Sequence, residues 1–453
     1  MTNQTHHERA SRLSIPDIGD GVIIGCLGGG AAVLFRYLLE HVADWGNAWY
    51  RRLHTQSGLS LFGWATLTCL TVVVLGLLVG SLVKRAPLSS GSGIPQVTGI
   101  LQGKLRTKPL PVLLSKYVGG LAANLIGMSL GREGPSIQLG AEAAQLYAGQ
   151  RGYSRGRRHR LMVAGAAAGL AAAFHAPLAA VVFTIEELRG ELRKQELVVV
   201  AISALSADLL AKLCFGWQPV FRFAVVKLPG ALLPWQLFWL PVLGIICGLL
   251  GGLFNVVLVR MQGLWQKLVT SVRMRVCVAF VLTFVLVWFW PALFGNGAPL
   301  LLGQQSQWIK EAGQMGAISL LSLLGLLAAR LLYTCFCYGS ATPGGIFLPT
   351  LVLGGMAGLI FGSVIPGGTP AGGTEAAAAQ LVVWIILAMG AVLTAVTGSW
   401  LTAVLLVLEM THCFEALLPL AATAMIALLT AKACGIEPIY ETLLEKMLIK
   451  KNQ

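Results

Sequence analysis

Charge is scarce in this sequence: only 11% of the 453 residues are Asp, Glu, Lys or Arg, whereas 56% are hydrophobic. Soluble domains carry about 25% charged residues, so an ordinary soluble fold is excluded. The mean hydropathy is +0.75. Apolar stretches long enough to cross a bilayer recur at 60–83, 161–185, 230–259, 276–293 and 317–332. The composition therefore predicts a polytopic α-helical membrane protein.

Motifs for metal binding and covalent catalysis are also missing. None of the nine cysteines has paired metal-ligand spacing, and Cys335 and Cys337 form only a C-x-C. No set of His, Asp and Glu has ligand spacing, and no nucleophile–base arrangement stands out. We expect the cysteines to behave as small buried hydrophobic residues and to form no disulfide framework. We also expect no cofactor and no metal.

The net charge of +14 comes from basic clusters in short segments between apolar runs. These clusters lie at 84–85, 104–108, 151–160, 189–194 and 446–451. Such placement is typical of the positive-inside bias of membrane proteins and of contact with anionic headgroups. It favours membrane lipids, and not nucleic acid, as partners.

Three short segments rich in glycine and proline interrupt the apolar sequence. They read GSGIP at 91–95, GREGP at 131–135 and GGIFLP at 344–349. Glycine or serine before a helix and proline just inside it predict a helix N-terminus, whose free N–H groups attract anions. Broken helices at membrane depth mark the substrate site of a transporter. The sequence therefore predicts a membrane protein that handles an anion.

The positions of the breaks suggest how the chain is organised. We expect a cytoplasmic tail at 1–19 without a cleavable signal peptide, a transmembrane domain at 20–445, a C-terminal tail at 446–453 and no regulatory domain. The break at 341–349 corresponds to the one at Glu133, so two inverted repeats, 20–215 and 236–445, are predicted. The predicted fold is all-α, with tilted and broken helices around a central anion site.

Two hydroxyl residues are candidates for anion binding. Ser92 lies between two glycines just before a predicted helix, where its hydroxyl and the following N–H groups could converge on one point; the alternative is a plain N-cap. Tyr440 carries a neutral phenolic donor near the C-terminus, and the alternative is a tyrosine of the interfacial aromatic belt.

Glu133 is the most informative acid, because a carboxylate at an anion-attracting helix end competes with the anion. Protonation removes that competition, which offers a link between proton and anion movement. The alternative is an ion pair with Arg132. Glu186 and Glu187 follow an apolar run, and on a helix one of them can face water and the other the bundle. Their alternative is a solvated helix end neutralised by nearby arginines.

Further polar residues in apolar surroundings have simpler interpretations. His175 is predicted to pack or cap locally, and Glu409 and Glu415 are predicted to lie at helix ends. Lys116 and Arg330 are candidates to balance buried acids.

In these motifs the chain resembles the CLC family of chloride channels and chloride/proton antiporters. The resemblance rests on GSGIP, GREGP and GGIFLP in that order, on Tyr440, and on AAAFHAPLAAVVFTIEELR at 171–189. It implies a homodimer with one pathway in each subunit. The chloride-binding groups it implies are the side chains of Ser92 and Tyr440 and the backbone N–H groups of Ile346 and Phe347. It also implies that Glu133 is an external gating glutamate and Glu187 an internal proton-transfer glutamate.

Within the family, the internal acid usually distinguishes antiporters from channels, and a serine at position 92 accompanies chloride preference. Gln96 and Thr98 stand where many relatives have acids, and His175 replaces a common asparagine. The resemblance therefore implies a chloride/proton antiporter of the bacterial inner membrane. The alternatives are a passive chloride channel of the same fold and a membrane-embedded hydrolase that uses Glu186 and Glu187.

Overall fold

The structure is a computed structural model that describes residues 15–55, 58–190, 192–221, 223, 237–294, 319–365 and 375–452. Residues 1–14 of the expected N-terminal tail, most of the segment between the two expected halves, and Gln453 lie outside the described residues. The described chain is almost entirely helical. β-Pairing within it is limited to an isolated antiparallel bridge between Gly131 and Gly345.

Within the described residues, the first half of the chain forms eight α-helices and two short helical segments. These are α2 (Ile15–Thr55), α3 (Gly58–Arg85), η1 (Pro87–Ser89), α4 (Ile94–Leu101), α5 (Pro109–Leu125), α6 (Glu133–Gln150), α7 (Arg155–Phe174), α8 (Pro177–Phe183), the π-helical η2 (Thr184–Arg189) and α9 (Lys194–Phe215). Pro95, Pro109 and Pro177 lie in the first turns of α4, α5 and α8, where a missing N–H costs no helical hydrogen bond.

The second half begins, in the described residues, with α11. Its helices are α11 (Trp239–Leu268), α12 (Val272–Phe294), α14 (Leu320–Gly339), α15 (Phe347–Val364), α16 (Glu375–Thr397), α17 (Trp400–Thr411), η5 (Phe414–Ala416), α18 (Leu417–Ala433) and α19 (Ile439–Asn452). Across the described ranges, nine helices are long and apolar enough to cross a membrane. Others, such as α8 with 7 residues and α17 with 12, are too short to cross alone. The predicted all-α polytopic architecture with broken helices is confirmed.

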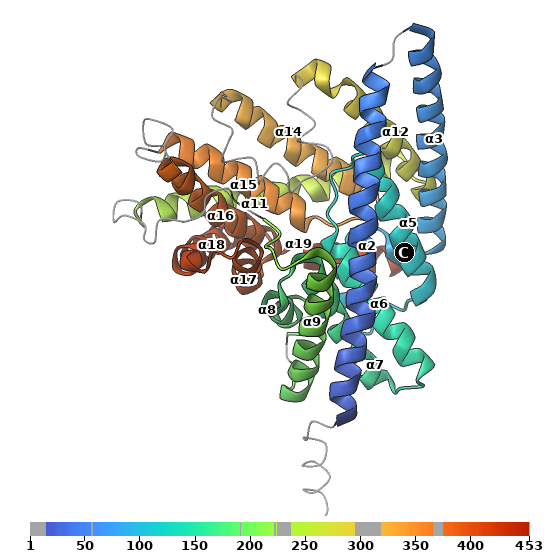
Figure 1. Cartoon of the computed structure of the whole chain (residues 1–453), viewed down its shortest axis with the longest axis vertical. Helices are drawn as coiled ribbons and strands as arrows, with labels where there is room; N and C mark the ends of the chain where they lie inside the picture. Colours follow the sequence, from blue (N-terminus) through green and yellow to red (C-terminus); the bar gives the residue numbers. More distant parts are fainter. Residues whose placement is uncertain are drawn as a thin grey trace, which may run out of the picture.

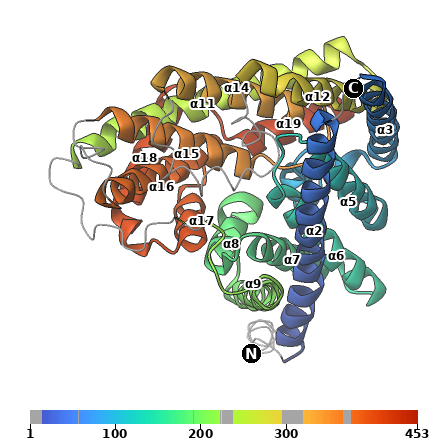
Figure 2. The same ribbon diagram turned by 45° about the horizontal axis from the view of Figure 1, so that its top comes forward.

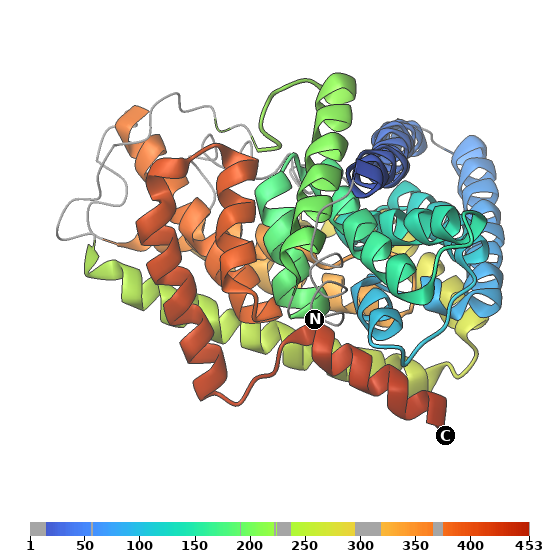
Figure 3. The same ribbon diagram turned by 90° about the horizontal axis from the view of Figure 1, so that it is seen from below.

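The two halves lie side by side and contact each other along several helices. Figure 1 shows α15, α16, α17 and α18 on one side of the molecule and α2, α5, α6 and α7 on the other. The halves meet where α8 packs on α17 and where α3 packs on α12 (Figure 2). The last helix, α19, runs along the face of the molecule opposite α2 and packs on α4 (Figure 3). The centre of the molecule is therefore built from both halves.

Close contact between α6 and α7 depends on two glycines. A Cβ atom added to Gly140 would collide with the carbonyl oxygen of Gly165, and one added to Gly165 would collide with that of Gly140. Small residues allow helices in a membrane to approach backbone to backbone, since packing must replace the hydrophobic effect there. This contact fixes α6, and with it Glu133 at its start, against the core of the first half.

Candidate anion site

The three predicted helix breaks meet at the centre of the molecule. Gly131 and Gly345 donate N–H groups to each other's carbonyl oxygens, both at 2.7 Å. Gly91 donates its N–H to the carbonyl of Thr342 at 3.2 Å and accepts from the N–H of Gly344 at 2.9 Å. Helices α4, α6 and α15 all begin at this junction. Their N-termini bring partial positive charges and free N–H groups together, which is the chemistry that holds an anion.

Ser92 points an unpaired hydroxyl into the junction. The chain turns sharply around it, with a φ of 60° at Gly91 and 104° at Gly93. Ser92 is fully buried; its N–H donates to the hydroxyl of Tyr338 at 3.4 Å, and its Oγ has no hydrogen bond of ordinary geometry within the described structure. The N-cap of α4 is Gly93, without a side-chain cap bond. The plain N-cap interpretation of Ser92 is therefore wrong.

Tyr440 lies in the first turn of α19, far along the sequence but at the same junction. It is only 3% exposed, and its ring stacks on Phe347, with ring centroids 5.9 Å apart and an interplanar angle of 17°. Its hydroxyl interacts electrostatically with Ser92 and Glu133 but has no well-formed hydrogen bond in the described residues. A tyrosine buried this deeply does not belong to an interfacial aromatic belt. Two buried hydroxyls that face each other without a well-formed hydrogen bond are expected to be satisfied by something else, such as an ion.

Glu133 reaches across the junction to the start of α15. Its carboxylate is fully buried, and Oε2 accepts from the N–H of Leu348 at 3.4 Å. Oε1 has no partner among the described residues. Arg132 instead contacts Glu40 of α2, with Nη1 3.3 Å from Oε1. The interpretation of Glu133 as half of an ion pair with Arg132 is therefore wrong. The carboxylate occupies the place that an anion would take at the N-terminus of α15.

Glu187 is a second acidic residue close to the junction of the three helix breaks. It lies in η2, directly after α8, and its Oε1 accepts from the hydroxyl of Ser399 at the start of α17. The backbone carbonyl of Glu187 accepts from the Thr98 hydroxyl of α4 at 3.4 Å. Glu187 therefore connects the short helices of both halves.

Glu186 points to a different partner. Its carboxylate accepts from the N–H groups of Leu401 and Thr402, at 3.2 and 2.7 Å, so it caps the N-terminus of α17. Arg189, expected to neutralise these acids, pairs with Glu196 at 2.8 Å instead. Glu186 is exposed, as a solvated helix end would be, whereas Glu187 is partly buried, so this interpretation fits at most one of the two acids.

Comparison with known proteins identifies the chain. The model of the voltage-gated chloride channel family matches residues 75–432. The chain belongs to the CLC family. The H(+)/Cl(-) exchange transporter ClcA of Vibrio cholerae is 34% identical over 445 residues, which cover 95% of this chain and 89% of that protein. The ClcA of Klebsiella pneumoniae is 36% identical over 375 residues, covering 82% and 76%.

Solved CLC structures share the fold. One described as a slow cyanobacterial Cl−/H+ antiporter superposes with a TM-score of 0.85 at 28% identity and covers 98% of this chain and 100% of its own. A CLC-type fluoride/proton antiporter superposes with a TM-score of 0.74 at 20% identity and covers 93% and 95%. The second likeness concerns the fold alone.

The structure adds residues to this CLC site that the sequence motifs do not reveal. Lys116 of α5 is fully buried and donates to the carbonyls of Ser89 and Gly91, at 2.8 and 2.7 Å. Its hydrogen bonds hold the loop that carries Ser92, and it also interacts electrostatically with the fully buried Glu142, as expected for a residue that balances a buried acid. Tyr338 and Ser399 approach the site from α14 and from the residue before α17. Neither has a local sequence signal, because only the fold brings them there.

Three of the remaining predicted polar residues lie close to helix ends. Glu409, in the last turn of α17, accepts from the N–H groups at the start of α8, and Glu415 lies in η5. His175 is the C-cap of α7, as predicted. Arg330 is buried within α14.

Proposed function

We propose that this CLC protein is a chloride/proton antiporter of the bacterial inner membrane. One observation carries the proposal: two carboxylates, Glu133 and Glu187, lie within electrostatic range of Tyr440, whose hydroxyl neighbours that of Ser92. A passive pore needs the hydroxyls and the helix ends but has no use for two acids. A coupled exchanger needs groups that carry protons past the anion.

Chloride is proposed to bind at the junction through partial charges. Ser92 and Tyr440 supply two hydroxyl donors, and Ile346 and Phe347 supply N–H groups, since the first N–H groups of α15 have no partner within the helix. A bound ion has to leave again, so weak dipolar ligands suit transport better than a direct contact with Lys or Arg. The nearby Lys116 donates its hydrogen bonds to backbone carbonyls.

Glu133 is proposed to act as the gate. In its ionised form it competes with chloride at the N-terminus of α15, and in its protonated form it loses that attraction and makes way for the anion. Each departure of the side chain moves a proton as well as opening the site. Glu187, held by Ser399, is proposed to relay protons between Glu133 and the cytoplasmic side.

Larger features complete the proposal. Residues 20–215 and 236–445 are proposed to be the two inverted repeats that place the site at their interface, with 1–19 and 446–453 as tails. The protein is proposed to work as a homodimer among anionic lipids. Native mass spectrometry in mild detergent should give twice the subunit mass of 48.0 kDa. A single subunit mass would contradict the dimer without touching the transport proposal.

The deciding experiment is proton uptake into liposomes that contain the purified protein, driven by an outward chloride gradient without a pH gradient. Uphill proton uptake is expected. Glu187→Ala should abolish proton uptake while chloride efflux continues, and Glu133→Gln should do the same by removing the gate. Chloride efflux without proton movement in the unmodified protein would make it a channel of the same fold.

A further inference from the structure

A groove lies between the helices α2 and α3. The two helices run side by side (Figure 1), but α2 packs closely on α9 and α3 on α12, and they contact each other only sparsely. Together with the end of α5 they enclose a cavity of about 240 Å³. A cavity of about 150 Å³ is large enough to admit benzene. The groove therefore has room for a segment of hydrocarbon chain.

The polar side chains inside the groove already have partners in the protein. Nε1 of Trp49 donates to the hydroxyl of Thr68 at 2.9 Å. The hydroxyls of Thr68 and Thr71 donate to carbonyls of their own helix, both at 2.8 Å, and the Tyr50 hydroxyl lies 3.5 Å from the carbonyl oxygen of Ile126. A buried water needs two to four polar partners, which these groups do not offer. The lining therefore favours an apolar occupant.

The rim of the groove faces outward from the protein. Thr71 lines the groove and is exposed, and its neighbours Leu67, Leu70 and Val74 on α3 expose large apolar side chains. An exposed apolar surface on a membrane-spanning helix is a surface for contact with the membrane. The acyl chains of the bilayer therefore have direct access to the groove.

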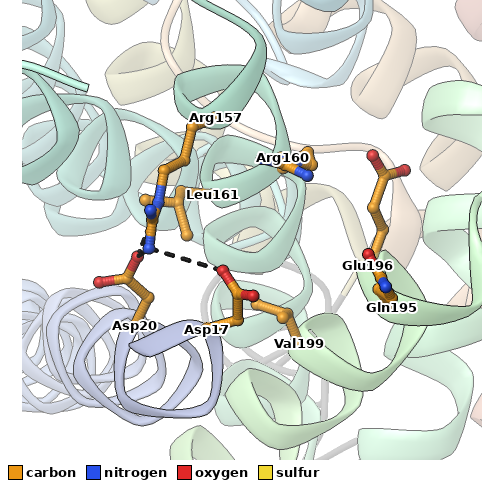
Figure 4. Close-up of a pocket in the computed structure, with 8 residues that line it drawn as sticks. All are labelled: Asp17, Asp20, Arg157, Arg160, Leu161, Gln195, Glu196 and Val199. Atoms are coloured by element: carbon orange, nitrogen blue, oxygen red, sulfur yellow. Dashed lines mark hydrogen bonds and ion pairs between the residues drawn. The ribbon is translucent and has the colours of Figure 1, made fainter. Parts of the chain in front are cut away.

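The position of the groove along α2 places it near one surface of the membrane. At the start of α2, Asp17 and Asp20 pair with Arg157 in a small charged pocket (Figure 4), which belongs in water or among headgroups. Trp45 at the rim of the groove lies 25 residues after Asp20, a rise of about 38 Å. The hydrocarbon core is about 30 Å thick, and aromatic residues gather at its edges. The groove therefore opens next to the opposite headgroup layer.

Arg52 brings positive charge to the mouth of the groove. Its side chain is exposed, and it lies one turn beyond Trp49 and two turns beyond Trp45, on the same side of α2. The nearest acids on α2 are Asp44, which lies on a neighbouring face, and Glu40, whose carboxylate pairs with two arginines. Arg52 is therefore placed to receive an anionic group from the headgroup layer.

We propose that the groove binds one anionic phospholipid, with an acyl chain between α2 and α3 and the phosphate on Arg52. The indole N–H of Trp45, which is 71% exposed at the rim, can donate to an ester or phosphate oxygen. Basic residues beside pockets between transmembrane helices are typical of headgroup sites. The bound lipid fills the space between two helices that contact each other only sparsely, and it links them.

Native mass spectrometry after mild detergent extraction from liposomes tests the proposal, with palmitoyl-oleoyl phosphatidylglycerol as the probe. We expect one retained phosphatidylglycerol in each subunit. Phosphatidylcholine with the same acyl chains should be retained about fivefold less, because one basic residue near an anionic headgroup contributes about that factor. Glycerol 3-phosphate has the phosphate without the acyl chains and should not displace the lipid.

Two variants test the two parts of the site. Thr71→Phe fills the groove from its rim and should abolish lipid retention. Thr66→Phe is the matched control, since Thr66 is also exposed on α3 and also donates to its own helix but lies outside the groove. Arg52→Gln should lower phosphatidylglycerol retention about fivefold. Arg51→Gln removes the same charge from the face of Asp44 and should keep most of the retention.

The melting temperature in detergent gives a second readout, because a ligand that binds only the folded protein raises it. Phosphatidylglycerol should raise it in the unmodified protein and in Thr66→Phe, but not in Thr71→Phe. Equal retention in Thr71→Phe and Thr66→Phe, or equal retention of the two phospholipids, overturns the inference. If Thr71→Phe instead splits a dimer into single subunits, the groove is a contact between subunits, which overturns it as well.

Discussion

Glu186 and Glu409 cap each other's short helices. Glu186, which follows α8, accepts hydrogen bonds from the N-terminus of α17, and Glu409, in the last turn of α17, accepts from the N-terminus of α8. The relationship is reciprocal, as expected for a pair of elements related by an inverted repeat. Because neither helix is long enough to cross the membrane, each depends on the other half for its first turn.

The reciprocal caps predict a stability effect. Glu186→Gln and Glu409→Gln should each lower the free energy of unfolding by about 1 kcal/mol, because an amide has one acceptor oxygen and no charge for the helix end. The melting temperature in detergent measures this loss. Glu415→Gln, in the exposed segment η5, serves as the control and should change the melting temperature little. Equal shifts in all three variants would show that the caps are unimportant.

Ser399 is predicted to matter for protons and not for chloride. Ser399→Ala removes the hydroxyl that donates to Glu187. Loss of one hydrogen bond to an ionisable group changes its protonation equilibrium by about 5- to 10-fold. Proton transfer through Glu187 should therefore slow by a similar factor. Simultaneous recording of proton and chloride fluxes gives the ratio. Ser363→Ala, on the exposed end of α15, should leave the ratio unchanged; if Ser399→Ala does so too, the hydroxyl has no part in the relay.

Gly134 is predicted to be essential for chloride binding. A Cβ there would collide with the hydroxyl of Ser92 and lie 2.7 Å from the Ser92 carbonyl oxygen. Gly134→Ala should therefore displace Ser92 and weaken chloride binding at least about tenfold, the effect of losing about 1.4 kcal/mol. Isothermal titration calorimetry with chloride measures the affinity. Gly149→Ala on the same helix meets nothing within 4 Å and should bind normally. Normal binding by Gly134→Ala would place chloride elsewhere.

The N-terminal end of α2 is predicted to be held mainly by Asp20. This residue is 5% exposed and accepts from Arg157 at 3.1 and 2.7 Å, as well as from the hydroxyls of Tyr147 and Tyr153. Asp20→Asn should cost roughly 3 kcal/mol, because it leaves a partly buried cation with less compensation. The neighbouring Asp17, 3.5 Å from Arg157, is more exposed, so Asp17→Asn should cost less than about 1 kcal/mol. Thermal unfolding in detergent distinguishes the two, and equal losses would refute this ranking.

Much of the fold could be predicted from the sequence, for a physical reason. Helices in a membrane satisfy their own backbone groups, so length and hydropathy alone indicate where they run. The breaks at 91–95, 131–135 and 344–349 carry their own signals in glycine and proline, and each does lead into a helix N-terminus. Helix spans and helix breaks depend on residues that are neighbours in the sequence, so the sequence alone can predict them.

The partners of each side chain could not be predicted in the same way. The carboxylate of Glu133 accepts from the N–H of Leu348, and the guanidinium of Arg132 pairs with Glu40, almost a hundred residues earlier. Glu186 bonds to residues beyond 400. Isolated motifs left an N-cap, an ion pair and a solvated helix end as reasonable alternatives, because those describe what neighbours in sequence can do. The actual partners of these side chains come from distant parts of the sequence that only the fold brings together.

The bridge between Gly131 and Gly345 also has a consequence for biosynthesis. The N–H groups of Gly91 and Gly131 find their acceptors in Thr342 and Gly345, which the ribosome adds more than two hundred residues later. Unsatisfied backbone groups cost several kcal/mol each in lipid. The newly inserted first half therefore cannot complete its own centre. Until the second half has been synthesised and inserted, these N–H groups have to be hydrated or shielded by the insertion machinery.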